Sequence, residues 1–143
     1  MNLYTIGFSQ KSAEEFFKIL KSNNVIRLID VRLNNKSQLA GFTNVKHLPY
    51  FLKIHGIEYL YRPDFAPSKK LLDGYKKKSI SWGEYEIEYT KILIQRNVIG
   101  KIDWKIFYDA VLLCSEPTAE KCHRRLLAEY LAQNKGDIKI KHL

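Results

Sequence analysis

The segment VIRLIDV, which runs from Val25 to Val31, combines five aliphatic residues with Arg27 and Asp30. A nearly continuous run of aliphatic and β-branched residues is typical of a strand that is covered on both faces, as in a parallel sheet. The segment AVLLC, from Ala110 to Cys114, has the same character. These two segments therefore predict a buried sheet, and Asp30 marks a charged end of one of its strands.

Strands and helices are expected to alternate around these two segments. Ser12 and Glu15 have the spacing of a capping box, which marks a helix start. This alternation predicts an α/β fold, with one domain over residues 1–143 and a mainly parallel sheet of about five strands with helices on both faces. The expected helices are Ala13 to Ser22, Val45 to His55, Ser81 to Arg96 (with Gly100 as a break) and Pro117 to Gln133, the other expected strands are Asn2 to Ile6, Ile57 to Tyr61 and Asp137 to Lys141, and the expected irregular segments are Leu33 to Asn44 and Arg62 to Lys78.

The carboxyl ends of the strands are the expected place for a site. In α/β sheets, ligands bind outside these ends, near the point where the strand order reverses. Numbering the strands along the chain, we expect the order 3-2-1-4, in which the first and fourth strands are neighbours. Polar residues follow these strands at Gly7 to Ser9, Asp30 to Arg32 and Ser115 to Glu116. The sequence therefore predicts a polar pocket at this edge of the sheet.

The composition restricts the class of protein and its partners. A chain of 143 residues suffices for one core, and its formal net charge of +9 favours anionic partners such as phosphates and nucleic acid. No apolar run reaches the roughly 18 residues of a membrane-spanning helix, and MNLYTIGFSQ lacks the pattern of a signal peptide. Cys114 and Cys122 are too few for a disulfide framework. We therefore expect a cytoplasmic protein with reduced thiols and no membrane partner.

Several short motifs resemble those of the domain of unknown function 488 family. The closing pair, Leu-Cys-x-Glu followed by Cys-His-Arg, is the most specific, and the resemblance covers nearly the whole chain. It implies a compact α/β domain in which the motif residues mark the site, and it implies no settled reaction. The motifs are TIGFS from Thr5 to Ser9, DVR from Asp30 to Arg32 followed by Ser37 and Gly41-Phe42, GIEY from Gly56 to Tyr59, LCSE from Leu113 to Glu116, and CHR from Cys122 to Arg124.

The chain departs from the family pattern at three places. Phe8 stands where the family usually has histidine, and Asn35 stands where it has proline. Phe65-Ala66-Pro67 stands where Leu-Gly-Gly is common. The first departure bears on chemistry, because this chain lacks an imidazole on the first loop for any mechanism that needs one there.

Two arginines, Arg32 and Arg124, are the candidate anion-binding groups. A guanidinium presents paired donors that match phosphate or carboxylate, so we expect the two to form a fork for a phosphate-bearing ligand. Asp30 is expected to orient Arg32, and the alternative is that it pairs with an arginine as a structural salt bridge. The other substrate-binding candidates are Ser9 and the backbone of Gly7 on the opposite wall, and Ser37 from the resemblance.

The catalytic candidates are Glu116, His123 and Asp30. We expect Glu116 at a helix start, where the helix dipole stabilises a carboxylate and suits it to act as a base or nucleophile; capping the helix or holding an arginine is the alternative. His123 is the acid–base candidate because imidazoles titrate near neutral pH, and packing is its alternative. Cys122 is a secondary candidate, expected as a buried thiol that does not face His123, since consecutive helix residues diverge.

No metal and no cofactor is predicted. Cys114, Cys122, His123 and His142 lack the spacing of zinc motifs, and the seven glycines are isolated rather than arranged in a phosphate-binding loop. The leading prediction is an enzyme with an anion-recognising pocket that acts on a phosphate-bearing small molecule or nucleic-acid component. One alternative is a nucleic-acid-binding module that uses the lysine-rich segment around Tyr75. The other is a protein-interaction domain, which needs an exposed apolar patch.

Overall fold

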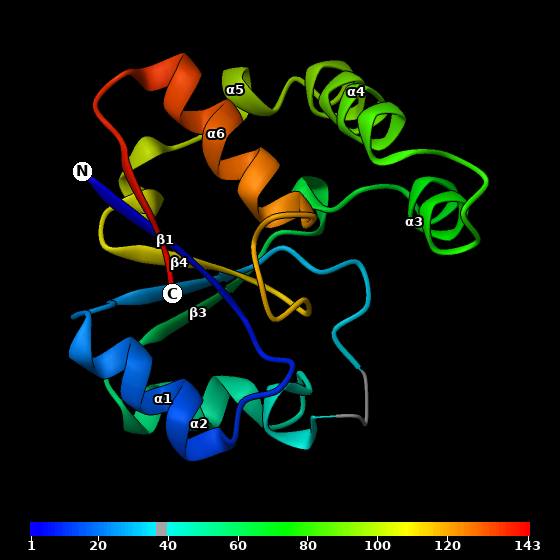
Figure 1. The fold of residues 1–143 in the computed structure, drawn as a ribbon. Coiled ribbons are helices and arrows are strands. Elements are labelled where there is room, and N and C mark those ends of the chain that lie inside the picture. The colour runs from blue at the N-terminus through cyan, green and yellow to red at the C-terminus, as the bar shows by residue number, and fades with distance from the viewer. Residues whose placement is uncertain (37–39) are drawn as a thin grey trace.

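Five parallel strands form one sheet in the order β3-β2-β4-β1-β5 (Figure 1). The computed structural model describes residues 1–36 and 40–143. The α/β class and the mainly parallel sheet predicted from the sequence are confirmed. The strands are β1 (Asn2–Gly7), β2 (Arg27–Asp30), β3 (Glu58–Tyr61), β4 (Ala110–Cys114) and β5 (Lys139–His142).

The predicted strand order is wrong in one respect. β1 and β4 are neighbours, as expected, and Gly7 lies opposite Cys114. However, β4 also pairs with β2, where Asp30 lies opposite Leu113, so β4 separates β1 from β2. β4 takes the central place because all of its residues are buried, whereas β1 exposes Asn2 at its start. The carboxyl ends of β1, β4 and β2 consequently lie side by side.

Helices cover both faces of the sheet, as predicted (Figure 1). Successive residues of a strand serve the two faces alternately, since Leu28 packs on the α1 side and Ile29 packs on the α6 side. On one face lie α1 (Ala13–Ser22) and α2 (Leu48–Ile54); on the other lie α4 (Trp82–Gln95), α5 (Val98–Lys101) and α6 (His123–Lys135), with α3 (Lys69–Lys76) beside α4. Within the described residues, short 3₁₀ helices span Gly41–Thr43 (η1), Pro63–Phe65 (η2) and Trp104–Phe107 (η3), and no helix is long and apolar enough to cross a membrane.

The capping box at the start of α1 is confirmed. The backbone N–H of Glu15 donates to Ser12 Oγ at 3.1 Å, and the backbone N–H of Ser12 donates to Glu15 Oε1 at 3.2 Å. Phe16, Phe17 and Leu20 then form the buried side of the helix. This arrangement fixes where the loop after β1 must end, and so shapes the carboxyl edge of the sheet.

Several element boundaries differ from those predicted, and three of the differences concern α3, α4 and α6. The segment Arg62 to Lys78 contains η2 and α3 rather than only irregular structure, because Ser68 Oγ accepts the backbone N–H of Leu71 at 3.2 Å and caps α3. α4 ends before Asn97, which has a left-handed backbone with φ of 51°, so Gly100 lies inside α5 instead of breaking a helix. α6 begins at His123 and not near Pro117, as the preceding residues form turns.

Candidate functional site

A cavity of about 1030 Å³ lies at the carboxyl ends of β1, β2 and β4. Three groups of residues line it. The floor, at the strand ends and the start of α6, contains Phe8, Arg32, Cys114, Cys122 and His123. The aromatic wall, from α3 and α4, contains Tyr75, Trp82 and Tyr85, and the lysine rim contains Lys11, Lys76, Lys78 and Lys121.

A buried salt bridge holds Arg32 at the floor. Its Nε donates to Asp30 Oδ1 and its Nη2 donates to Asp30 Oδ2, both at 2.8 Å. The Tyr59 hydroxyl also donates to Oδ2 at 2.7 Å. Burial, followed by the bond to Asp30, raises the pKa of Tyr59 far above its ordinary value, so Tyr59 remains a donor. The Asp30 carboxylate is fully buried and is occupied by these partners, and it is not among the groups that line the cavity.

One donor of Arg32 is left over. Nη2 makes a further bond to the carbonyl of Thr43 at 2.7 Å. Nη1, however, is buried and has no hydrogen-bond partner among the residues that the structure describes. The guanidinium carbon lies 5.5 Å from the centre of the Phe8 ring, so an aromatic face covers one side of the group. A buried charged donor without a partner is costly, and Arg32 is among the residues that line the cavity.

Arg124 has different partners from Arg32. It is fully buried, its Nε donates to Thr5 Oγ1 at 3.3 Å, and its Nη1 donates to the carbonyl of Glu116 at 2.9 Å. Its guanidinium therefore ties the loop after β4 to β1, and Arg124 is not among the residues that line the cavity. In the described structure the two arginines are thus held separately, and only Arg32 reaches the cavity.

Glu116 lies at the edge of the cavity with an exposed side chain. Since α6 begins seven residues later, at His123, the carboxylate is not on the first turn of a helix. The expected stabilisation by a helix dipole therefore does not apply. Glu116 and Arg32 do share this cavity, and the accessible carboxylate is free to meet a ligand from the solvent side.

The structure brings Cys114, Cys122 and His123 together at the floor. Cys122 is the N-cap residue of α6, not a residue within the helix, so the argument that it diverges from His123 fails. The three ligand atoms all lie within 4.8 Å of one another, and His123 Nδ1 lies 3.5 Å from Cys114 Sγ. All three residues are buried. The sequence predicted Cys114 only as the last residue of a buried strand. Its place at the carboxyl end of that strand, where ligands bind in α/β sheets, could have marked it as a site residue.

The two thiols differ in acidity. The thiol of Cys122 beside Cys114 lowers the pKa of Cys114, despite burial, and Arg124 adds to the lowering. The hydrogen bond to Cys114 raises the pKa of Cys122, and burial raises it further.

Two further predicted site residues, Gly7 and Ser9, lie at the end of β1 and in the loop that follows it. Ser9 lines the cavity. Gly7 serves as a point of close approach, because a Cβ atom built on it would lie 1.5 Å from the carbonyl oxygen of Glu116. Ser37 lies outside the described residues. The loops after β1 and β4 are therefore packed directly on each other beneath the cavity.

A comparison with known protein families identifies the family of this chain. The model described as "Domain of unknown function DUF488" matches residues 12–131. The chain belongs to the DUF488 family. The matched range includes every floor residue of the cavity except Phe8. No match was found among curated proteins or among solved structures.

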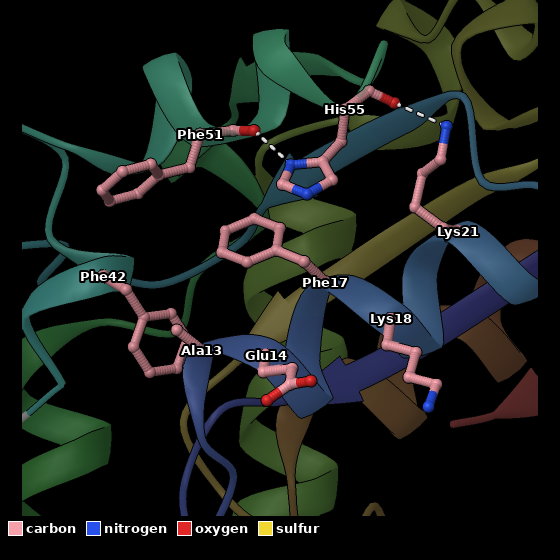
Figure 2. Close-up of a pocket in the computed structure, with 8 residues that line it drawn as sticks. All are labelled: Ala13, Glu14, Phe17, Lys18, Lys21, Phe42, Phe51 and His55. Carbon is pink, nitrogen blue, oxygen red and sulfur yellow. Dashed lines mark hydrogen bonds between the residues drawn. The ribbon is translucent and has the colours of Figure 1, made fainter.

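The DUF488 domain has a second, shallower cavity of about 520 Å³ between α1 and α2 (Figure 2). There the Phe17 ring stacks on the imidazole of His55, with centres 4.8 Å apart. His55 Nδ1 lies 2.7 Å from the carbonyl of Phe51, and Lys21 Nζ donates to the carbonyl of His55 at 3.1 Å. Figure 2 shows Lys18 pointing away from these rings. The polar groups here join the two helices, so we assign this cavity a packing role.

Proposed function

We propose that this DUF488 domain is an enzyme that binds a phosphate-bearing small molecule or nucleic-acid component in the cavity at the carboxyl edge of its sheet. The observation that carries the proposal is Nη1 of Arg32, which has no hydrogen-bond partner within residues 1–36 and 40–143 and belongs to a guanidinium that Asp30 holds in a fixed orientation. Guanidinium donors recognise phosphate oxygens with defined geometry. A phosphate oxygen bound at Nη1 would complete the hydrogen bonding of Arg32.

The charges around the cavity support an anionic ligand. The four lysines of the lysine rim line the cavity, and Glu116 is the only acid among the described lining residues. Such a border raises the local concentration of anions and speeds their association.

The aromatic wall supports a ligand with a flat ring. Trp82 and Tyr85 stack with centres 4.9 Å apart and planes 15° apart, and Tyr75 lies 5.4 Å from Trp82. Aromatic faces beside a positive surface are typical of sites that stack nucleobases. A mononucleotide therefore fits the combined chemistry of rim and wall better than inorganic phosphate does.

Glu116 is the proposed general base or nucleophile of this site. The side chain of Glu116 is exposed at the edge of the cavity. The His123 ring, in contrast, is held by a contact of 2.9 Å between its Nε2 and the carbonyl of Val31. Asp30 acts by orienting Arg32, as its own carboxylate is occupied. The proposed roles are thus anion binding by Arg32, proton transfer or attack by Glu116, and positioning by Asp30.

Replacing Arg32 by lysine tests the anion site. Arg32→Lys keeps a positive charge beside Asp30 and removes Nη1, so we expect the affinity for adenosine monophosphate to fall about 10- to 100-fold, the cost of a charge-assisted hydrogen bond. Calorimetric titration of the folded variant and of wild type measures this change.

Arg62→Lys is the matched control for this experiment. Arg62 also makes two bonds to a carboxylate, that of Asp64, at 2.9 and 2.7 Å, and it also lies over an aromatic ring, that of Phe65, but it does not line the cavity. Its replacement should leave the affinity within about twofold. Equal affinities for all three proteins would contradict the anion site. Binding of an oligonucleotide alone, weakening steeply with salt, would instead favour the nucleic-acid-binding module.

Replacing Glu116 by glutamine tests the enzymatic part of the proposal. Glu116→Gln keeps the size of the side chain and removes its charge, so turnover of any substrate found by screening phosphate esters and nucleotides should fall about 10²- to 10⁴-fold, the range for a lost acid–base group. Steady-state kinetics measures the change, and Glu120→Gln, on an exposed side chain outside the cavity, is the control. Unchanged turnover in Glu116→Gln would remove this residue from the reaction.

A further inference from the structure

Three potential metal ligands meet at the floor of the cavity. Cys114 ends β4, Cys122 caps α6, and His123 is the first residue of α6. We infer that Cys114 Sγ, Cys122 Sγ and His123 Nδ1 bind a zinc-class divalent cation. This inference concerns the same cavity as the proposed function, but it depends on the ligand geometry and not on the binding of an anion.

The spacing of the donor atoms fits a tetrahedral ion. With Zn–S near 2.3 Å and Zn–N near 2.0 to 2.1 Å, two ligands of one tetrahedral ion lie about 3.5 to 3.8 Å apart. Cys114 Sγ and His123 Nδ1 are 3.5 Å apart, and all three donors lie within 4.8 Å of one another. On binding the ion, the side chains would have to shorten the longest of these separations by up to about 1 Å.

The histidine is oriented as metal-binding histidines usually are. His123 Nε2 lies 2.9 Å from the carbonyl of Val31, and because a carbonyl only accepts, Nε2 carries the proton. Nδ1 then holds the lone pair, and Cys114 Sγ lies 3.5 Å from Nδ1 and 3.8 Å from Nε2, so a turn of the ring would aim this lone pair at a shared ion. A ligand histidine commonly donates its other N–H to a backbone carbonyl in this way, which fixes both tautomer and ring orientation.

The surroundings suit two thiolates and a divalent ion. Two thiolates would neutralise the charge of the ion, and both sulfur-bearing residues are buried. Tyr89 packs edge-on against the His123 ring at 5.8 Å and shields it from solvent on that side. The three residues are therefore shielded from bulk solvent, with 3 to 5% of their surface exposed.

The fourth position of the ion faces the cavity, since all three ligand residues line it. Zinc sites with three protein ligands and one open position are typical of catalysis, whereas structural sites have four protein ligands. The open position would accept a water molecule or an oxygen atom of the anionic ligand, within the cavity that Glu116 also borders. The spacing Cys-x₇-Cys-His matches no common zinc motif, which is why sequence reasoning predicted no metal.

Metal uptake by reduced protein tests this inference. Protein made without a polyhistidine tag, reduced and stripped of metal, is titrated with Zn²⁺ against a chromophoric chelator and separately with Co²⁺. We expect one equivalent of each and a thiolate-to-cobalt charge-transfer absorption. Cys122→Ser places a preferred residue at the helix N-cap, so it should not disturb α6. Cys122→Ser and His123→Gln should each weaken Zn²⁺ binding about 100-fold or more. This loss exceeds the 10- to 100-fold that is typical when a residue that only hydrogen-bonds to a metal ligand is replaced.

His47→Gln is the matched control, because His47 is exposed and remote in sequence from the three ligands, and it should bind Zn²⁺ like wild type. Circular dichroism establishes that each variant is folded. Failure of reduced wild type to take up Zn²⁺, or full uptake by the folded Cys122→Ser and His123→Gln variants, would overturn the inference. If the isolated protein had no free thiols, its two cysteines would form a disulfide. If it then bound no Zn²⁺ after reduction, the metal inference would be overturned. Because no phosphate or nucleotide is present, failure here leaves the anion site untouched.

Discussion

Replacement of Asp30 by asparagine is expected to lower the free energy of unfolding by about 3 to 5 kcal/mol, the cost of leaving a buried charge without its partner. The asparagine side chain would keep the shape of the aspartate but lose the charge that faces Arg32, which is 4% exposed. The Tyr59 hydroxyl, now 2.7 Å from Oδ2, would also lose an ionised acceptor. Urea unfolding followed by circular dichroism measures the loss.

Asp64→Asn provides the comparison, because Asp64 makes the same two-bond contact to Arg62 at the surface. The Asp64 side chain is 43% exposed, and exposed ion pairs contribute only about 0 to 1 kcal/mol. Near-equal losses for Asp30→Asn and Asp64→Asn would show that burial does not set the strength of the Asp30–Arg32 pair. A large loss for Asp30→Asn alone would identify this pair as the structural support of the anion site.

Replacement of Gly7 by alanine is expected to cost about 3 kcal/mol or more of unfolding free energy, at the upper end of the range for inserted methyl groups in packed sites. The new Cβ would meet the Glu116 carbonyl oxygen at 1.5 Å and Arg124 Nη1 at 3.1 Å. The loop after β4 would have to move, and the Arg124 bond to the Glu116 carbonyl with it. Unfolding in urea reports the displacement, and so would the affinity of the zinc site proposed above, since this loop connects Cys114 to Cys122.

Gly83→Ala is the control for this change. Gly83 lies in the first turn of α4, where an added Cβ meets only Ser81 Oγ, at 3.8 Å. Alanine favours helix over glycine, so this variant should be as stable as wild type or more stable by up to about 1 kcal/mol. If Gly7→Ala also proved neutral, the close packing of the two loops would not be required for the fold.

The α/β architecture could be predicted from the sequence because strands and helix starts are marked by short stretches of neighbouring residues. The buried runs at Val25 to Val31 and Ala110 to Cys114 predicted strands, and Ser12 with Glu15 predicted the start of α1. The strand order was harder, because β4 is central through its contacts with both β1 and β2, which depend on the whole sheet. The helix α3 was missed although Ser68 and Leu71 have the spacing of its cap.

The candidate site could be predicted only in part, because its residues are far apart in the sequence and come together only in the folded chain. The placing of Arg32 and Glu116 at one edge followed from the rule for strand ends, and both line the cavity. The grouping of Cys114 with His123 did not follow, because it depends on α6 beginning at His123 and not near Pro117. Because the predicted helix began near Pro117, the side-chain directions predicted for Cys122 and His123 were wrong.

The most direct test of the anion site is a crystal structure of the protein soaked with adenosine monophosphate. We expect a phosphate oxygen within hydrogen-bond distance of Arg32 Nη1, with the base against the aromatic wall. A structure in which Arg32 Nη1 is bonded to the protein itself and the nucleotide contacts only surface lysines would contradict the proposed anion site.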